Sequence, residues 1–196
     1  MAILKRHNRL RHSTPAGFRW LSLAIVLGML MSTGTALRAQ PPGSPEYLLK
    51  AAFLYNIAKF VEWPPAALST SNTPMTVCVV GDAFGTAIET VEGKQVQGHP
   101  LTVKQDPSVN AAKDCHLLFV SETELGKSAA LLAAVKGGPV LTVCDSARCT
   151  ERGFMVNLQL TDNKVGLEIN MDTVQLAPIK ISSQLMKLAR LVSHNR

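Results

Sequence analysis

The sequence predicts an α/β fold: a single-domain sandwich whose mostly parallel or mixed sheet is flanked by helices. Short apolar, β-branched runs, of which Met75 to Val80 is the clearest, alternate with segments that carry helix-start and helix-end signals. This alternation is typical of a parallel sheet. Two further strand-like runs, 154–160 and 165–170, flank a turn sequence and predict a hairpin. Because a hairpin is antiparallel, we expect the sheet to be mixed.

Residues 1–39 are predicted to be a signal peptide, residues 40–44 a spacer and residues 45–196 the folded domain. The leader contains six Lys or Arg and no acidic residue, an apolar run from Trp20 to Met31, and then small residues, with cleavage expected near Ala39. The alternative is an uncleaved N-terminal anchor, although the apolar run is shorter than the roughly 20 residues that span a bilayer. We therefore expect an exported protein.

The charge of the remaining chain argues against a nucleic-acid partner. From Gln40 onward, 14 basic residues face 14 acidic ones, so the net charge of +6 belongs to the leader. A nucleic-acid-binding domain needs a basic surface, which a balanced chain does not provide.

The first predicted helix runs from about residue 45 to residue 62. Ser44, Pro45 and Glu46 are helix-start signals, and Pro64 follows the expected end. Its apolar residues cover more than one stripe, and its polar residues do not gather into one face. Such a helix is either buried on two sides or docks another chain. For docking, the candidate partner-binding residues are Leu48, Phe53, Ile57 and Phe60.

The later elements follow from the same signals. Ser121 is a candidate cap for one helix, and Ser182 or Ser183 for the last one. In order, we expect a strand at 75–80, a short helix at 84–91, a turn and strand within 94–105, a strand at 115–120, a helix at 121–135, a strand at 139–143, the hairpin, a short helix at 171–177 and a final helix reaching about residue 194.

Four cysteines in an exported chain suggest two disulfides. The layout favours a pair between Cys144 and Cys149, which are close in the chain, and a pair between Cys78 and Cys115, which lie in neighbouring predicted strands. Buried free thiols are the alternative. The short bridge would close an exposed loop and is therefore the candidate for a reducible bridge. No C-x-x-C pair is present, so a zinc site is not expected.

Chemistry-bearing residues are few. Gly81 and Asp82 follow one predicted strand and Asp145 follows another. The carboxyl ends of parallel strands often form ligand crevices, so these three residues are candidates for a small-ligand site. No nucleophile, general base, metal site or cofactor motif is recognisable. We predict that the protein is not an enzyme and needs no cofactor.

Seven ordered blocks resemble the YfiR family. They include the first helix from Lys50 to Pro64, the strand and turn from Val79 to Gly85, and the segment from Lys180 to Arg190; the others are 93–103, 115–121, 140–143 and 167–170. The resemblance implies a periplasmic α/β protein without catalysis and with two disulfides. Cys78 and Cys115 correspond to the long-range disulfide of the family, and Cys144 and Cys149 to the short one. Cys144 and Phe154 stand where many relatives have Gly.

The resemblance also implies a function. The best-known family members repress an inner-membrane diguanylate cyclase by binding its periplasmic region, which lowers cyclic di-GMP and biofilm formation. An outer-membrane-associated protein can sequester them, and they form homodimers. A periplasmic small-ligand-binding protein without a cyclase partner is the alternative. The residues themselves say nothing about cyclases, so this expectation rests on the resemblance alone.

Overall fold

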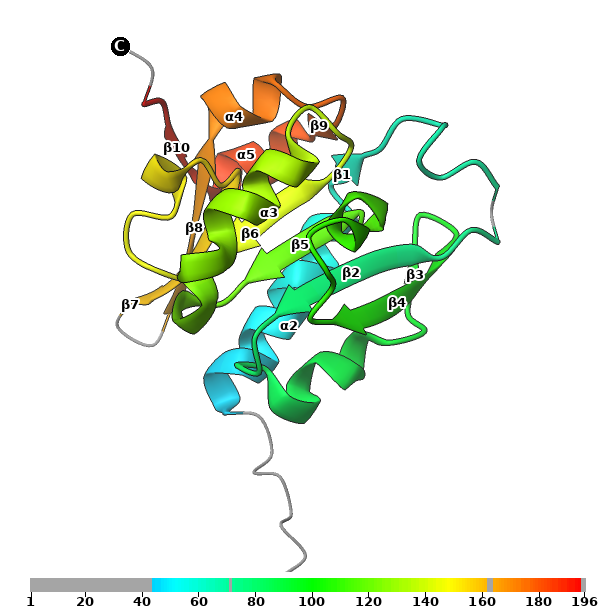
Figure 1. Ribbon diagram of the computed structural model, residues 1–196, viewed down its shortest axis with the longest axis horizontal. Coiled ribbons are helices and arrows are strands. Elements are labelled where there is room, and N and C mark those ends of the chain that lie inside the picture. The colour runs from blue at the N-terminus through cyan, green and yellow to red at the C-terminus, as the bar shows by residue number, and fades with distance from the viewer. Residues whose placement is uncertain (1–43, 71, 162–163, 195–196) are drawn as a thin grey trace, which may run out of the picture. The chain divides into compact units, whose positions relative to one another are not determined.

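A mixed eight-stranded sheet forms the centre of the computed structural model, which describes residues 44–70, 72–161 and 164–194 (Figure 1). The strand order is β10-β8-β7-β6-β5-β2-β4-β3. The predicted fold class is thus confirmed. The strands are β2 (Met75–Val80), β3 (Gln95–Val96), β4 (His99–Gln105), β5 (Leu117–Val120), β6 (Leu141–Cys144), β7 (Val156–Thr161), β8 (Lys164–Asn170) and β10 (Arg190–Val192).

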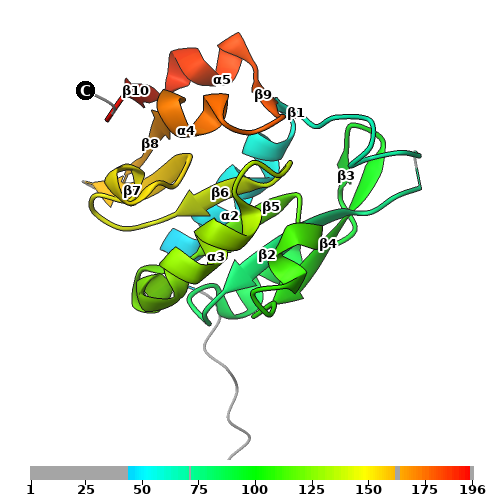
Figure 2. The same ribbon diagram turned by 45° about the horizontal axis from the view of Figure 1, so that its top comes forward.

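The central strands are parallel. Strand β2 pairs with β4 and β5, β5 with β6, and β6 with β7, all in parallel, whereas β7 and β8 form the predicted antiparallel hairpin. At the edges, β3 is antiparallel to β4 and β10 is parallel to β8. A separate two-stranded ribbon joins β1 (Val61–Glu62) to β9 (Lys180–Ile181), as Figure 2 shows.

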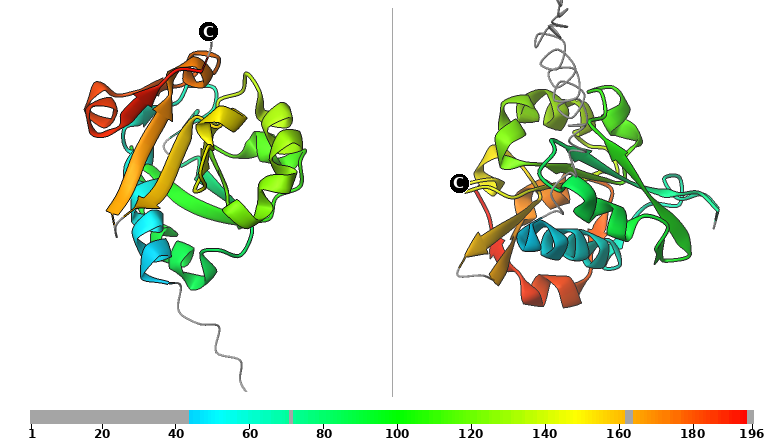
Figure 3. Two further views of the ribbon diagram at one scale, coloured as in Figure 1. Left: turned by 90° about the vertical axis from the view of Figure 1, so that its left-hand side faces the viewer. Right: turned by 90° about the horizontal axis from the view of Figure 1, so that it is seen from below.

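Helices lie on both faces of the sheet, with α2 (Pro45–Ala58) on one face and α3 (Ser128–Val135) on the other (Figure 3, left). We call these the α2 face and the α3 face. The remaining helical segments are α4 (Met171–Gln175), α5 (Ser183–Leu188) and the 3-10 turns η1 (Gly85–Val91), η2 (Ala111–Asp114), η3 (Glu122–Lys127) and η4 (Thr150–Arg152).

Both faces of the central strands are buried because both are covered. In β2, Val77 and Val79 belong to a large apolar cluster under α2, whereas Cys78 and Val80 belong to a smaller cluster under α3. Side chains alternate between the faces of a strand, so a continuous apolar run fills two cores at once. This is why the run from Met75 to Val80 carries no polar alternation.

Three helices differ most from the sequence prediction. Helix α2 ends at Ala58, not near residue 62, because Val61 and Glu62 pair with β9. The predicted helix 121–135 is a 3-10 segment followed by α3, and the Ser121 side chain makes no capping hydrogen bond. The final helix ends at Leu188, since Arg190–Val192 form the edge strand β10; Ser182 caps that helix by accepting from Leu185 N.

The predicted leader and most of the spacer lie outside the described residues. Among the residues that are described, no helix combines the length and the hydropathy needed to cross a bilayer.

Candidate functional site

Helix α2 buries one charged residue within an otherwise apolar side and exposes two leucines. Its buried side carries Lys50, which is only 2% exposed, next to apolar residues such as Ala51 and Leu54. Leu48 and Leu49 lie outside this side and are 45% and 40% exposed. The two leucines form a small exposed apolar surface on the first turns of α2.

The four predicted partner-binding residues are not on one surface. Leu48 is exposed, Phe53 and Phe60 are partly buried against the large apolar cluster, and Ile57 is 1% exposed within that cluster. Ile57 therefore holds the helix in place and does not face solvent. Leu49 was not among the predicted partner-binding residues. The signal that indicated Leu48, an apolar residue in a helix without a polar face, applies to Leu49 as well. We use "α2 patch" for Leu48, Leu49 and the exposed edge of Phe53.

A buried ion pair fixes the first turns of α2 to the sheet. Lys50 Nζ lies 2.8 Å from Asp145 Oδ2, and the two side chains are 3% and 1% exposed. The Tyr47 hydroxyl donates to the same oxygen at 3.0 Å, and Glu122 N donates to Asp145 Oδ1 at 2.9 Å. Glu46 adds a second carboxylate to Lys50. Because every charge in this cluster has a partner, its burial is tolerable.

The surroundings of Tyr47 also shift its titration. Burial and the adjacent Asp145 carboxylate raise the pKa of the Tyr47 phenol above its usual value. The phenol consequently stays protonated at any physiological pH and remains a hydrogen-bond donor to Asp145. The Tyr47 ring also packs edge-on against Phe84, with ring centroids 5.1 Å apart. This contact ties the same turn of α2 to the residues before η1.

The three residues of the predicted small-ligand site lie in different environments. Both Asp145 oxygens accept bonds from inside the protein, and Asp82 is exposed. Gly81 adopts φ +94°, and its N–H donates to Asp106 Oδ1 at 2.9 Å. A Cβ at Gly81 would collide with Ser121, so the close approach of that segment also requires glycine. Ligand binding by these residues stays a prediction. In the structure, Asp145 anchors α2 and Gly81 allows a close approach to Ser121.

Both disulfides are present in the pairing that the sequence favoured. Cys78 in β2 is joined to Cys115 just before β5, with Cα atoms 5.9 Å apart, and Cys144 at the end of β6 is joined to Cys149, with Cα atoms 6.2 Å apart. All four cysteines belong to the smaller apolar cluster under α3. The short bridge begins at the residue before Asp145, so the loop it closes is continuous with the anchor of α2.

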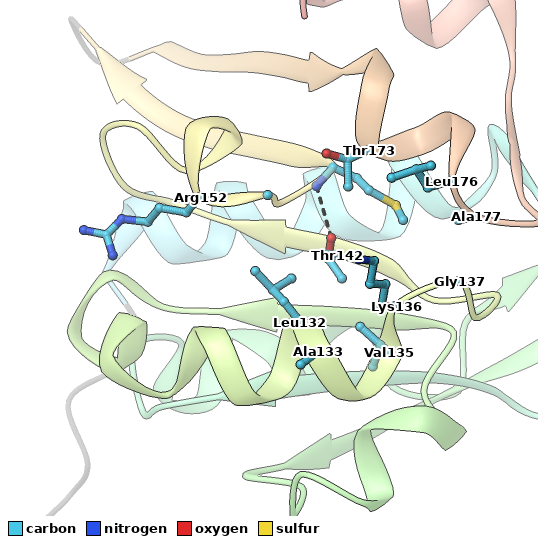
Figure 4. Close-up of a pocket in the computed structure, with 12 residues that line it drawn as sticks. Leu132, Ala133, Val135, Lys136, Gly137, Thr142, Arg152, Thr173, Leu176 and Ala177 are labelled. Atoms are coloured by element: carbon cyan, nitrogen blue, oxygen red, sulfur yellow. Dashed lines mark hydrogen bonds between the residues drawn. The ribbon is translucent and has the colours of Figure 1, made fainter. Parts of the chain in front are cut away.

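An apolar pocket of about 260 Å³ lies between α3, β6, η4 and α4 (Figure 4). Leu132, Val135 and Leu176 supply much of its lining. The Thr142 hydroxyl within it already accepts from Met155 N at 3.1 Å, and the Arg152 guanidinium points away from the pocket. Few directed polar groups remain there to orient a ligand.

No group of three or more His, Cys, Asp or Glu side chains in the described part of the chain is arranged to hold a metal ion. The histidine nearest the core has a structural arrangement: Thr76 N donates to His116 Nδ1 at 3.0 Å, and His116 Nε2 lies 3.0 Å from Ala67 O. Since Nδ1 accepts, the proton of the neutral ring sits on Nε2 and is donated to Ala67 O.

Comparison with known proteins gives one result. The family model described as YfiR/HmsC-like matches residues 47–190, which is nearly the whole of the described fold. Comparison with curated proteins gave no match.

Proposed function

Since this chain belongs to the YfiR/HmsC-like family, we propose that it is a periplasmic regulatory binding protein. In this proposal it represses an inner-membrane diguanylate cyclase by binding the periplasmic region of that enzyme, and so lowers cyclic di-GMP and biofilm formation. The protein acts by surface contact and not by catalysis.

The exposed leucines of the α2 patch are the observation that carries the proposal. Leu48 and Leu49 stand on a helix whose first turns are immobilised by the Lys50–Asp145 pair. A rigid apolar patch loses little conformational entropy when it is covered, which favours binding. Leu48 and Leu49 are already more than half buried, so covering the surface that they still expose contributes on the order of 1–3 kcal/mol to an interface.

The disulfides support placement outside the cytoplasm, because such bonds form and persist in oxidising compartments. They agree with the predicted export. Homodimer formation and capture by an outer-membrane-associated protein are further parts of the proposal, and their support is the family relationship alone.

The test is binding to the isolated periplasmic region of a membrane diguanylate cyclase from the same organism, measured by calorimetry. We expect the native oxidised protein to bind, and the double variant Leu48→Ser/Leu49→Ser to bind at least about tenfold more weakly. Leu176→Ser is the matched control because Leu176 is 65% exposed but lines the pocket beside α3. It should bind like the native protein.

Two results would count against the proposal. If the native protein binds in neither its oxidised nor its reduced form, repression through this contact is excluded. If the Leu176 variant loses as much affinity as the α2 double variant, the α2 patch is not the contact surface.

A further inference from the structure

The apolar pocket on the α3 face is open to solvent between two helices. Leu132 and Val135 form its wall on α3, and Leu176 and Ala177 form the opposite wall at the end of α4 (Figure 4). Leu176 is a large apolar residue and is nevertheless 65% exposed, so nothing in the described chain covers this wall. The volume of about 260 Å³ is close to the lower limit for ligand pockets. The pocket therefore fits a small apolar group.

The lining offers few hydrogen-bonding groups. Thr142 and Thr173 are its uncharged polar side chains, and Thr142 Oγ1 already accepts from Met155 N at 3.1 Å. A ligand rich in polar groups would give up hydrogen bonds to water in this pocket without replacing them, which is unfavourable. An alkyl chain gives up none, and the free energy that it gains by leaving water grows with each methylene group. The lining thus favours an alkyl chain.

The charged residues of the lining are cations. Lys136 and Arg152 line the pocket, no Asp or Glu does, and neither cation forms an ion pair with another described residue. The Arg152 guanidinium points away from the pocket (Figure 4), whereas Lys136 directly follows Val135, the last residue of α3. The charge at the pocket therefore favours a ligand whose head group is an anion, and Lys136 is the residue placed to meet it.

We propose that this pocket binds a medium-chain aliphatic carboxylate. The alkyl chain lies between α3 and α4, and the carboxylate accepts a hydrogen bond from Lys136 Nζ at the mouth of the pocket. The volume equals that of roughly eight or nine molecules of liquid water, and a methylene group is of similar size, so chains of about eight carbons fill it.

The inference is independent of cyclase binding, because it uses neither the α2 patch nor a partner protein. The site is also separate from the small-ligand site predicted from the sequence, since none of Gly81, Asp82 and Asp145 lines this pocket.

The experiment titrates butanoate, hexanoate, octanoate and decanoate into the oxidised protein by calorimetry, each below its micelle concentration. We expect saturable binding whose affinity rises about two- to fourfold per methylene group up to octanoate, because each added group leaves water. The affinity should level off at decanoate, whose chain extends beyond the pocket. Octanol should bind about two- to fivefold more weakly than octanoate, because it lacks the charge that pairs with exposed Lys136.

Two pairs of variants locate the site. Ala133 is exposed and lines the pocket, so Ala133→Trp fills the pocket without entering the core and should weaken octanoate at least about tenfold. Ala129→Trp, exposed one turn earlier on α3 and outside the lining, is the matched control and should bind octanoate like the native protein. Lys136→Gln should lower the affinity for octanoate to that for octanol, and Lys187→Gln, an exposed lysine outside the pocket, should leave it unchanged.

Four outcomes would overturn the inference. Absence of saturable octanoate binding would mean that the pocket takes no alkyl chain. Equal octanoate affinity in the Ala133 and Ala129 variants would mean adsorption elsewhere on the surface. Phenylpropionate binding more tightly than octanoate would show that the pocket selects a ring. Native affinity for octanoate in Lys136→Gln would reject the proposed position of the carboxylate.

Discussion

The two faces of the sheet are stabilised in different ways. Under α2 lies the larger apolar cluster, which has no cysteine and contains large buried side chains such as Phe84 and Phe119. Under α3 the cluster is smaller, and both disulfides lie in it. Burial of apolar surface alone stabilises a small core poorly, and covalent links reduce the entropy of the unfolded chain instead. The covalent bonds are thus placed where apolar packing is thinnest.

On the α2 face, the buried Lys50–Asp145 ion pair is the feature most sensitive to a single substitution. A buried salt bridge contributes little compared with well-packed apolar residues, yet losing one partner is costly because the other charge stays buried. The comparison therefore predicts that the α2 face is sensitive to a single charge removal and the α3 face to reduction.

The largest expected effect is on the α2 face. Lys50→Met should lower the free energy of unfolding by about 3–5 kcal/mol, since Asp145 would keep a buried negative charge without its cation. Urea unfolding of the oxidised protein measures this loss. Lys59→Met, at the exposed C-cap of the same helix, is the control and should change stability by less than about 1 kcal/mol. Equal losses in both variants would show that the pair has no special role.

The next effect is on the α3 face. Replacing Cys78 and Cys115 together by Ala should lower stability by about 3–4 kcal/mol on the chain-entropy model, because the bridge joins residues separated by 37 positions. Chemical denaturation of native protein and variant gives the difference. A loss well below that of the short bridge would contradict the view that the long bridge is the main covalent support of this face.

The short bridge should matter less for global stability. Replacing Cys144 and Cys149 by Ala should cost about 2 kcal/mol, since the closed loop is small. Cys144 precedes Asp145, so hydrogen exchange should also rise at Glu122 N, which donates to Asp145. Unchanged hydrogen exchange at Glu122 N would show that the short bridge does not stabilise the Asp145 contacts that anchor α2.

The contrast between the faces was only partly predictable. The apolar runs that became β2, β5 and β6 indicated a covered parallel sheet, because nothing but burial on two sides explains such runs. Strand β10 was missed since Arg190 and Val192 continue the helical spacing of the preceding segment, and only pairing with β8 makes them a strand. Local pattern carries no information about such a distant partner.

The site was harder to predict than the fold. Lys50 interrupts the apolar side of α2, which was visible in the sequence, but its partner Asp145 lies 95 positions away. Ile57 and Leu48 are equally apolar in the sequence, and only the direction in which α2 packs makes one of them core and the other surface.

The smallest expected effect concerns the edge of the sheet where β2 and β5 begin, which supports both faces. Burial lowers the pKa of His116 from its usual value near 6.5, because the charged ring would be poorly solvated. The unfolded chain therefore binds a proton more readily than the folded one. The contribution of neutral His116 is complete above pH 6.5 and is lost as the pH falls through the lowered folded pKa, with a slope of at most about 1.4 kcal/mol per pH unit.

Protonation would also place a hydrogen on His116 Nδ1, which now accepts from Thr76 N, and so break a bond at the start of β2. Urea unfolding between pH 7.5 and 5 measures the slope, and His116→Asn should flatten it. His99 is partly exposed and contacts Thr73 O, and its charge is only a minor cause of the lowered pKa of His116, so His99→Asn serves as the control and should change the slope much less than His116→Asn does. A native slope retained in the His116 variant would show that acid acts elsewhere, and the edge of the sheet would then be no more sensitive to pH than either face.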